Sequence, residues 1–413
     1  MLSKEDNDLL TRVHPGSATG ELFRRYWIPA LLAEEIPQPD CPPVRVRLLG
    51  EDLVAFRDSA GRIGLLGEHC AHRGTSLFFG RNEECGLRCI YHGWKYDVEG
   101  KVLETPAEPA GSQLKYKVQH TAYPCIEAGG MVFAYLGPRQ AQPLFPTYTW
   151  LGVPQPQIYI AKSQLECNYL QALDGDCDSA HLNYLHKTFQ PDGRHNALRH
   201  EDQAPTFEIE EMDFGFRVAA IRKIGAQRYV RVSQFVMPFI GCVPVGREVG
   251  GRLDGFKAVY QVPADDYTTW RYDFFFKYAK PMTREDSSKR DFVDAHYRKL
   301  RNLRNNYLQD RQAQKTANFT GIEEFLNQDA CATESMGAIA DRTREHLGVS
   351  DSYVIQVRRF LLKAVKDVQA GKAPPGVVYD PAKAEFDRVR CEVAYLPERA
   401  SWRELFDRTE EQR

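Results

Sequence analysis

The spacing of apolar side chains changes several times along the chain. Up to about residue 38 they recur three and four positions apart, as at Leu9 and Val13, which predicts helices. From Val44 to about Leu136, short alternating runs are separated by turn residues, a pattern typical of antiparallel strands. We predict a helical segment over 1–43 that packs on the later domain over 141–413, and an antiparallel β domain over 44–140.

The second half of the chain mixes both periods. A proline-rich stretch over 138–156 reads as a linker, a helical pattern follows over 167–188, and strand patterns occupy 206–279. A charged stretch over 282–318 precedes further helical patterns over 321–345 and 350–371. We therefore predict an α+β domain over 141–413, with an antiparallel sheet and helices.

Composition excludes several classes of protein. The 413 residues are 43% hydrophobic and 11% aromatic, enough for a sizeable core, and 54 basic against 56 acidic side chains leave a net charge of −2. A near-neutral chain without clustered basic residues is not typical of nucleic-acid or anionic-membrane binders. The apolar runs fall short of the roughly 20 residues that span a bilayer, and the amino terminus lacks the order of an export signal. We expect a cytoplasmic protein.

Ten cysteines are too few for a disulfide scaffold, so cysteines with histidine partners indicate metal chemistry. Two motifs each combine one cysteine with one histidine: Cys70-x-His72 and Cys89-x2-His92. Zinc fingers instead pair two cysteines in one turn. One residue of each kind per turn suits a [2Fe-2S] cluster in which one iron takes both thiolates and the other both imidazoles. A structural zinc knuckle is the alternative.

A second group of metal-binding residue types lies in the predicted helix over 167–188. Asp174, Asp178 and His181 are four and three residues apart, which places them on one stripe of a helix. His186 lies about 140° from His181 on an ideal helix, so both bind one ion only if the helix is distorted or ends between them. Two histidines and one carboxylate hold ferrous iron with open positions for dioxygen. Asp329 is the candidate carboxylate, with Glu323, Glu324 and Glu334 as alternatives.

These motifs resemble those of Rieske ring-hydroxylating oxygenases. The extra cysteine that respiratory Rieske proteins carry in each loop is absent, and the block Asp178-x2-His181-x4-His186 is similar to the iron-binding segment of the oxygenases. The resemblance covers nearly the whole chain. It is closest to the single-subunit phthalate dioxygenase type, through segments such as 45–57 and 334–348.

The resemblance implies more than the residues alone do. It implies a Rieske β domain followed by a catalytic domain of helix-grip, START-like fold, a mononuclear Fe(II) site, and O2 as co-substrate. It further implies a head-to-tail homotrimer, or a stacked hexamer. In such a trimer Asp178 would bridge His181 to His92 of the neighbouring subunit.

The expected function is that of a terminal oxygenase which cis-dihydroxylates an aromatic carboxylate, phthalate-like or phenoxybenzoate-like. Because no dinucleotide fingerprint is found, electrons are expected from a separate NAD(P)H-dependent reductase. Arg222 and Arg231, on predicted strands, are the candidates for binding the substrate carboxylate, with Arg217 and Lys223 as competitors. The alternatives are a monooxygenase or O- or N-demethylase of an aromatic compound and, in another class, a Rieske electron carrier.

Overall fold

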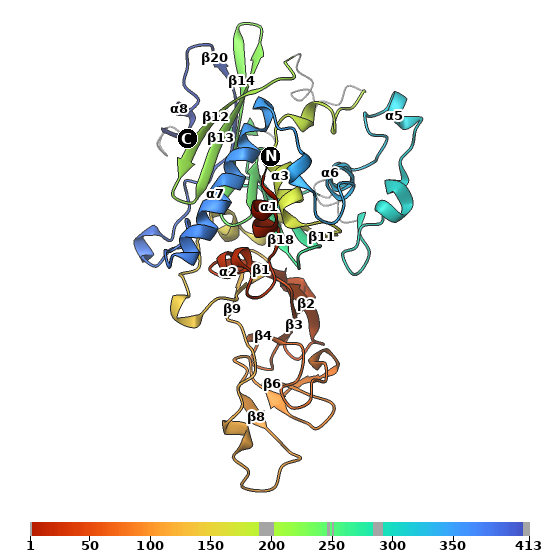
Figure 1. The fold of residues 1–413 in the computed structure, drawn as a ribbon, viewed down its shortest axis with the longest axis vertical. Helices are drawn as coiled ribbons and strands as arrows, with labels where there is room; N and C mark the ends of the chain where they lie inside the picture. Colours follow the sequence, from red (N-terminus) through yellow and green to blue (C-terminus); the bar gives the residue numbers. More distant parts are fainter. Residues whose placement is uncertain (1, 190–201, 246–247, 250–251, 284–291, 408–413) are drawn as a thin grey trace.

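The computed structural model describes residues 2–189, 202–245, 248–249, 252–283 and 292–407. Its outline is elongated, with a slim part extending away from a broad one (Figure 1). The slim part contains the short strands between residues 44 and 104, and the broad part contains the long strands and helices that follow residue 158. None of the described helices is both long and apolar enough to cross a membrane.

Two short helices open the chain. Helix α1 (Lys4–Thr11) begins where the Ser3 hydroxyl accepts a hydrogen bond from the Asp6 N–H, and α2 (Ala18–Phe23) is capped by Ser17 in the same way. Strand β1 (Trp27–Leu32) then pairs with β10 (Met131–Tyr135), which pairs with β9 (Cys125–Ala128). The predicted helical pattern was wrong over β1. All six of its side chains are buried, so this strand has no polar alternation to reveal it.

The slim part is built from two small antiparallel sheets, as the alternating pattern predicted. The first contains β2 (Val44–Leu48), β3 (Glu51–Arg57) and β4 (Ile63–Gly67) in that order. The second contains β5 (Arg81–Glu83), β6 (Gly86–Arg88), β7 (Lys95–Tyr96) and β8 (Val102–Glu104). Their shared core includes Phe56, Leu87 and Tyr96 and also takes in Cys70 and Cys89.

One large antiparallel sheet forms the centre of the broad part. Its main path runs β11 (Ile158–Leu165), β19 (Thr269–Phe276), β18 (Lys257–Pro263), β15 (Ile240–Val243), β14 (Gln227–Val236), β13 (Gly215–Ile224) and β12 (Thr206–Met212). Strand β20 (Glu392–Pro397) also pairs with β14, and β16 (Glu248–Val249) forms a separate hairpin with β17 (Arg252–Leu253). The strands predicted over 206–279 are confirmed.

Helices pack against this sheet. Helix α7 (Ser352–Gln369) crosses β12 and β13, with Phe360 and Phe216 ring centroids 4.8 Å apart. Helix α3 (Tyr169–Asp176) contacts β15, β18 and α6 (Phe325–Glu334), while α5 (Ala313–Thr316) and α8 (Glu404–Asp407) are short. The predicted α+β class is confirmed. The helices predicted over 167–188 and 321–345 are shorter than expected, because non-helical turns follow α3 and precede and follow α6.

Candidate metal centres and cavity

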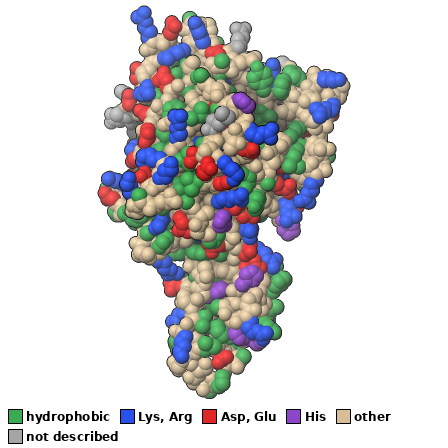
Figure 2. All heavy atoms as spheres, in the orientation of Figure 1, with side chains coloured by type: hydrophobic (Ala, Val, Ile, Leu, Met, Phe, Trp, Pro, Cys, Tyr) green, Lys and Arg blue, Asp and Glu red, His purple; other side chains and the backbone are tan. Residues whose placement is uncertain are grey.

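Two equivalent turns bring the first set of predicted ligands together in the slim part. Cys70 follows β4 and Cys89 follows β6, and both side chains are 3% exposed. His72 and His92 are half-buried, and their ring centroids lie 4.5 Å apart. Histidine side chains reach the surface of this part of the molecule (Figure 2). The thiols therefore lie on the core side of the pair of turns and the imidazoles nearer to solvent.

The backbone of the two turns follows one plan. The Gly74 N–H donates to the Cys70 carbonyl at 2.8 Å, and the Gly93 N–H donates to the Cys89 carbonyl at 3.1 Å. Both glycines have positive φ, +77° and +73°, which favours residues without a Cβ. At Gly93 a Cβ would also lie 2.7 Å from Pro106, so this turn excludes other residues for two reasons.

Aromatic residues from β7 and the residue before it complete this site. The Trp94 indole stacks on His72 with centroids 4.7 Å apart and parallel planes, and the Tyr96 hydroxyl lies 3.0 Å from the Cys70 sulfur. Burial raises the pKa of the Cys89 thiol, the Tyr91 N–H lowers it, and nearby Cys70 raises it further. Two buried thiols next to two partly exposed imidazoles form a donor set that a [2Fe-2S] cluster with mixed ligands would fit.

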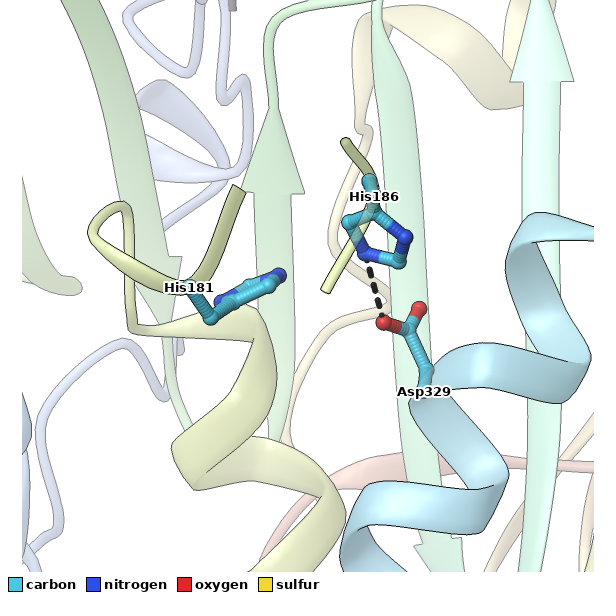
Figure 3. Close-up of side chains that lie close together, drawn as sticks. All are labelled: His181, His186 and Asp329. Atoms are coloured by element: carbon cyan, nitrogen blue, oxygen red, sulfur yellow. Dashed lines mark ion pairs between the residues drawn. The ribbon is translucent and has the colours of Figure 1, made fainter. Parts of the chain in front are cut away.

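The second set of ligands comes together in the broad part (Figure 3). His181, His186 and Asp329 offer ligand atoms that all lie within 4.8 Å of one another. His186 Nε2 lies 2.9 Å from Asp329 Oδ1, and the two histidine rings have centroids 5.2 Å apart. Two imidazoles and a carboxylate are the donors that a ferrous site requires.

The end of α3 explains how histidines five residues apart can face one ion. The helix stops at Asp176, and His181 opens a 3-10 turn over His181–Asn183. The Asp178 carboxylate accepts a hydrogen bond from the Ala180 N–H at 2.6 Å and so stabilises this turn. The expected single helical stripe of Asp174, Asp178 and His181 is wrong, because only Asp174 lies on α3.

Asp174 faces away from the two histidines. Its carboxylate pairs with Arg342 at 3.1 Å and with Arg358 on α7 at 2.7 Å. Both arginines are buried. Asp174 thus ties α3 to α7.

His186 is held firmly by residues of and near α6. Its Nδ1 lies 2.7 Å from the Gln328 side-chain oxygen, whose amide nitrogen donates to the Ile322 carbonyl at 2.8 Å. The His186 ring also stacks on Phe325 with centroids 3.4 Å apart. The amide orientation makes Nδ1 the protonated nitrogen and leaves Nε2 as the electron-pair donor. Nε2 is buried and makes no hydrogen bond, which a cation between it and Asp329 would explain.

Among the acidic candidates near α6, Asp329 is the residue that reaches both histidines. Glu334 is buried elsewhere, where it accepts hydrogen bonds from Lys299 and Tyr307. Glu323 pairs with Arg301, and Glu324 is exposed at the start of α6. Although burial raises the pKa of Asp329, His186, Arg271 and His181 together hold it far below the ordinary value, so this carboxyl is ionised.

Asp178 lies at the edge of the same site. Its Oδ2 is 3.4 Å from His181 Nδ1, and its side chain is 27% exposed. Burial raises the pKa of Asp178, but the His181 side chain and the backbone N–H groups of Ala180 and His181 lower it, and the net shift is downward. Asp178 also lines the cavity next to His181, so its carboxylate is partly accessible.

A cavity that opens to solvent adjoins His181 and Asp329. Apolar side chains such as Phe207, Val218 and Val243 line it together with a few polar ones. Such a mixed wall suits a ring-sized apolar ligand with a polar substituent.

The arginines predicted for substrate binding lie in different places. Arg231 on β14 lines the cavity, where its Nη2 donates to the Pro244 carbonyl at 3.0 Å. Arg222 on β13 is buried and donates to the Ser179 carbonyl at 2.7 Å. Burial, together with the nearby Arg231, lowers the pKa of Arg222 to about 10.

The two competing residues lie elsewhere. Arg217 pairs with Glu210 and packs against Phe406, and Lys223 is exposed. Neither is among the residues that line the cavity.

The sequence analysis missed several residues of the site, because they belong to no motif with the spacing of metal ligands. Lys257 and Asp176 line the cavity, and Gln261, Arg271 and Asp273 lie buried around them. Burial raises the pKa of Asp176 to about 6, against the lowering effect of Arg271 and Lys257. The only available hint was a lysine, a glutamine, an arginine and an aspartate within otherwise apolar strands.

Both the slim part and the broad part of the molecule match known protein families. Residues 26–124 match the Rieske [2Fe-2S] domain, and residues 134–413 match the family model described as LigXa C-terminal domain like. The phthalate 4,5-dioxygenase oxygenase subunit of Pseudomonas putida is 42% identical, over 91% of this chain and 89% of its own length. The 5,5'-dehydrodivanillate O-demethylase oxygenase subunit of a Sphingobium species is 31% identical, over 92% and 85%.

A solved structure supports the fold. The NdmA QL mutant of Pseudomonas putida CBB5, solved with theobromine, superposes with a TM-score of 0.64 at 20% identity. It covers 88% of this chain and 99% of its own.

Proposed function

The chain belongs to the Rieske oxygenase subunits with a LigXa-like C-terminal domain, and we propose that it is the terminal component of a system that cis-dihydroxylates an aromatic carboxylate. Enzymes of this family use a [2Fe-2S] cluster, a mononuclear iron and O2. One observation carries the proposal. The His181, His186 and Asp329 group opens onto a cavity that also contains Arg231.

Each metal has its proposed ligands. Cys70 and Cys89 would bind one iron of the cluster, and His72 and His92 the other. The mononuclear iron would take His181, His186 and Asp329 and would supply the site where dioxygen is reduced. We assign electron entry to 44–140 and oxygen chemistry to 141–413, with 1–43 packed on the latter.

The residues around the iron site perform distinct tasks. Gln328 and Phe325 orient His186, and the Asp178 carboxylate accepts from the His181 ring and holds it. The apolar cavity wall excludes water from the bound ring of the substrate. Addition of both atoms of O2 to a ring double bond also consumes two electrons and two protons, which must arrive from outside.

Arg231 is the proposed anchor of the substrate carboxylate. Its hydrogen bond goes to the neutral Pro244 carbonyl, and among the described residues no carboxylate pairs with it. Lys257, in contrast, already pairs with Asp273 at 3.0 Å. A half-buried guanidinium in an apolar cavity wall binds a carboxylate through charge-assisted hydrogen bonds. The two relatives described above act on substrates that are themselves aromatic carboxylates, according to their names.

The electrons are proposed to pass between subunits. Figure 1 shows the slim part, which carries the cluster residues, extending away from α3 and α6, which carry the iron residues. Electron tunnelling weakens steeply with distance, so a cluster at the far end of the same chain is a poor donor. A head-to-tail homotrimer, or a stacked hexamer, would place His92 of the neighbour beside Asp178. A separate NAD(P)H-dependent reductase would supply the electrons, in the cytoplasm.

The second candidate reaction is demethylation of a methoxylated aromatic acid. It is favoured by the O-demethylase relative, which matches nearly the whole chain. Both reactions need the same ligands and the same carboxylate anchor.

Product analysis tests the proposal. The iron-loaded protein, reduced by a partner reductase, would be incubated with a panel of benzoates, phthalates, phenoxybenzoates and methoxybenzoates under ¹⁸O2. We expect a cis-diol with both atoms labelled. Formaldehyde and a phenol would favour the demethylase, and the same products from His181→Ala would overturn an oxygenase role for this site.

Iron and acid-labile sulfide assays should give three irons and two sulfides per chain, and zinc without sulfide would contradict the cluster.

A further inference from the structure

A buried network of charged side chains lies directly behind Asp329. Arg271, on β19, is 3% exposed. Its Nε and Nη2 donate to the two oxygens of Asp273, at 2.8 and 3.0 Å. Asp273 is fully buried and also meets Lys257 Nζ at 3.0 Å.

The charges of this network do not cancel among themselves. Arg271 and Lys257 bring two positive charges to one carboxylate, that of Asp273. A buried excess charge requires a further partner. Arg271 finds it in Asp329, whose Oδ2 accepts from Nη2 at 3.4 Å and from Nη1 at 3.5 Å. Asp176 lies farther off, with its Oδ1 3.9 Å from Nη2.

The two oxygens of Asp329 therefore have different neighbours. Oδ1 lies 2.9 Å from His186 Nε2, on the side of the histidines. Oδ2 faces the guanidinium of Arg271. Because Arg271 is itself held by two hydrogen bonds to Asp273, a neighbour on the same strand, it cannot easily follow a rotation of the Asp329 carboxylate.

We propose that Arg271 is a positioning residue which retains Oδ2 of Asp329, so that this carboxylate offers the metal a single oxygen. A carboxylate can bind a metal through one oxygen or two, and the second oxygen would occupy a position that the two-histidine, one-carboxylate arrangement otherwise leaves open. Arg271 thereby preserves coordination space for dioxygen on the cavity side. The inference rests on the proposed function insofar as it requires a metal at His181, His186 and Asp329.

Cobalt provides a test that does not depend on activity. Cobalt(II) resembles ferrous iron in size and coordination, and its anomalous scattering distinguishes the mononuclear site from the iron of the cluster. Crystal structures would be determined for the cobalt-loaded wild-type protein and for Arg271→Gln, which removes the charge and the fork of donors. We expect one Asp329 oxygen on cobalt in the wild type and both oxygens in Arg271→Gln.

Arg358→Gln is the matched control. Arg358 is likewise buried and pairs with the carboxylates of Asp174 and Glu345, but it does not contact Asp329. Its loss should leave the cobalt ligands unchanged. If Arg271→Gln does not fold into a protein that binds its cluster, Arg271→Lys is used in its place. Arg271→Lys keeps the positive charge but not the planar fork of donors. It too should let Asp329 bind through both oxygens.

The outcomes separate this inference from the proposed function. Both oxygens on cobalt in the wild type, or a single oxygen in the Arg271 variant whose structure is determined, would overturn the role of Arg271 and leave the oxygenase proposal intact. A wild-type structure without cobalt at His181 and His186 would overturn the proposed iron site, and the inference with it.

Discussion

Gln328 directly precedes Asp329 on α6, and the two side chains contact different nitrogens of the His186 ring. Its amide oxygen meets His186 Nδ1 at 2.7 Å, which leaves Nε2 to face Asp329. Replacing it with leucine, of similar size, removes the acceptor and leaves a buried N–H without a partner. Loss of such a partner typically weakens metal binding by about 10- to 100-fold, and we expect that range for the ferrous dissociation constant of Gln328→Leu, measured by competition with a chelator.

The neighbouring buried amide supplies the control for this prediction. Asn327 donates to the Glu323 carbonyl and contacts neither histidine in the described structure. Asn327→Leu should therefore retain wild-type iron affinity, and Gln328→Glu, which keeps an acceptor, should restore it. Equal affinities in Gln328→Leu and wild type would contradict the orienting role.

Arg231 and Arg222 lie on adjacent strands and give opposite expectations. Only Arg231 lines the cavity, whereas Arg222 is directed to Ser179. Hydrogen bonds to charged groups contribute about 1.5 to 3 kcal/mol, so Arg231→Met should raise the KM for an aromatic carboxylate by roughly 10- to 150-fold. The KM for the corresponding neutral amide should change little. If Arg222→Met raises KM for the acid as much as Arg231→Met does, the assignment of the anchor is wrong.

At the scale of elements, one carboxylate joins α3 to α7. Asp174 is the shared partner of Arg342 and Arg358, whose side chains are 1% and 4% exposed. Removing one member of a buried ion pair costs about 3 to 5 kcal/mol. Asp174→Ala should lower the calorimetric melting temperature of the catalytic part accordingly, without bleaching the cluster. Asp367→Ala removes a carboxylate of similar exposure, 18%, whose partners Lys363 and Lys372 are exposed instead of buried. It should lower that temperature much less, and a similar shift in both variants would contradict the argument.

How much of each site the sequence predicted depended on how far apart its residues lie along the chain. The turns that carry Cys70 and Cys89 each hold their candidate ligands within a few residues, so spacing alone was enough to propose them. The separation of His181 and His186 indicated that a regular helix could not continue through both, and α3 indeed ends first. Asp329 was one candidate beside three glutamates, because its partners lie more than a hundred residues away and spacing cannot select among the four. Arg271 and Gln328 depend on contacts between separate elements, and no periodicity encodes those.

The whole molecule poses the question of where its electrons travel. In one chain the cluster residues and the iron residues belong to parts that extend away from each other (Figure 1). Ile90 and Tyr91, which directly precede His92, are 59% and 55% exposed, and the Asp178 side chain beside His181 is 27% exposed. Apolar side chains that are exposed in one chain next to a metal ligand are typical of a surface that another subunit covers.

Mixed assemblies can decide between transfer within and between chains. Cys89→Ala lacks a complete cluster site, and His181→Ala lacks a complete iron site, so neither homo-oligomer should turn over. If electrons cross a heterologous, ring-closing interface, co-expression in equal amounts gives about one quarter of the junctions an intact cluster facing an intact iron site. We expect product formation near a quarter of the wild-type rate per chain, with each variant alone inactive. Transfer within one chain leaves every chain short of one centre, and the mixture would then be as inactive as its components.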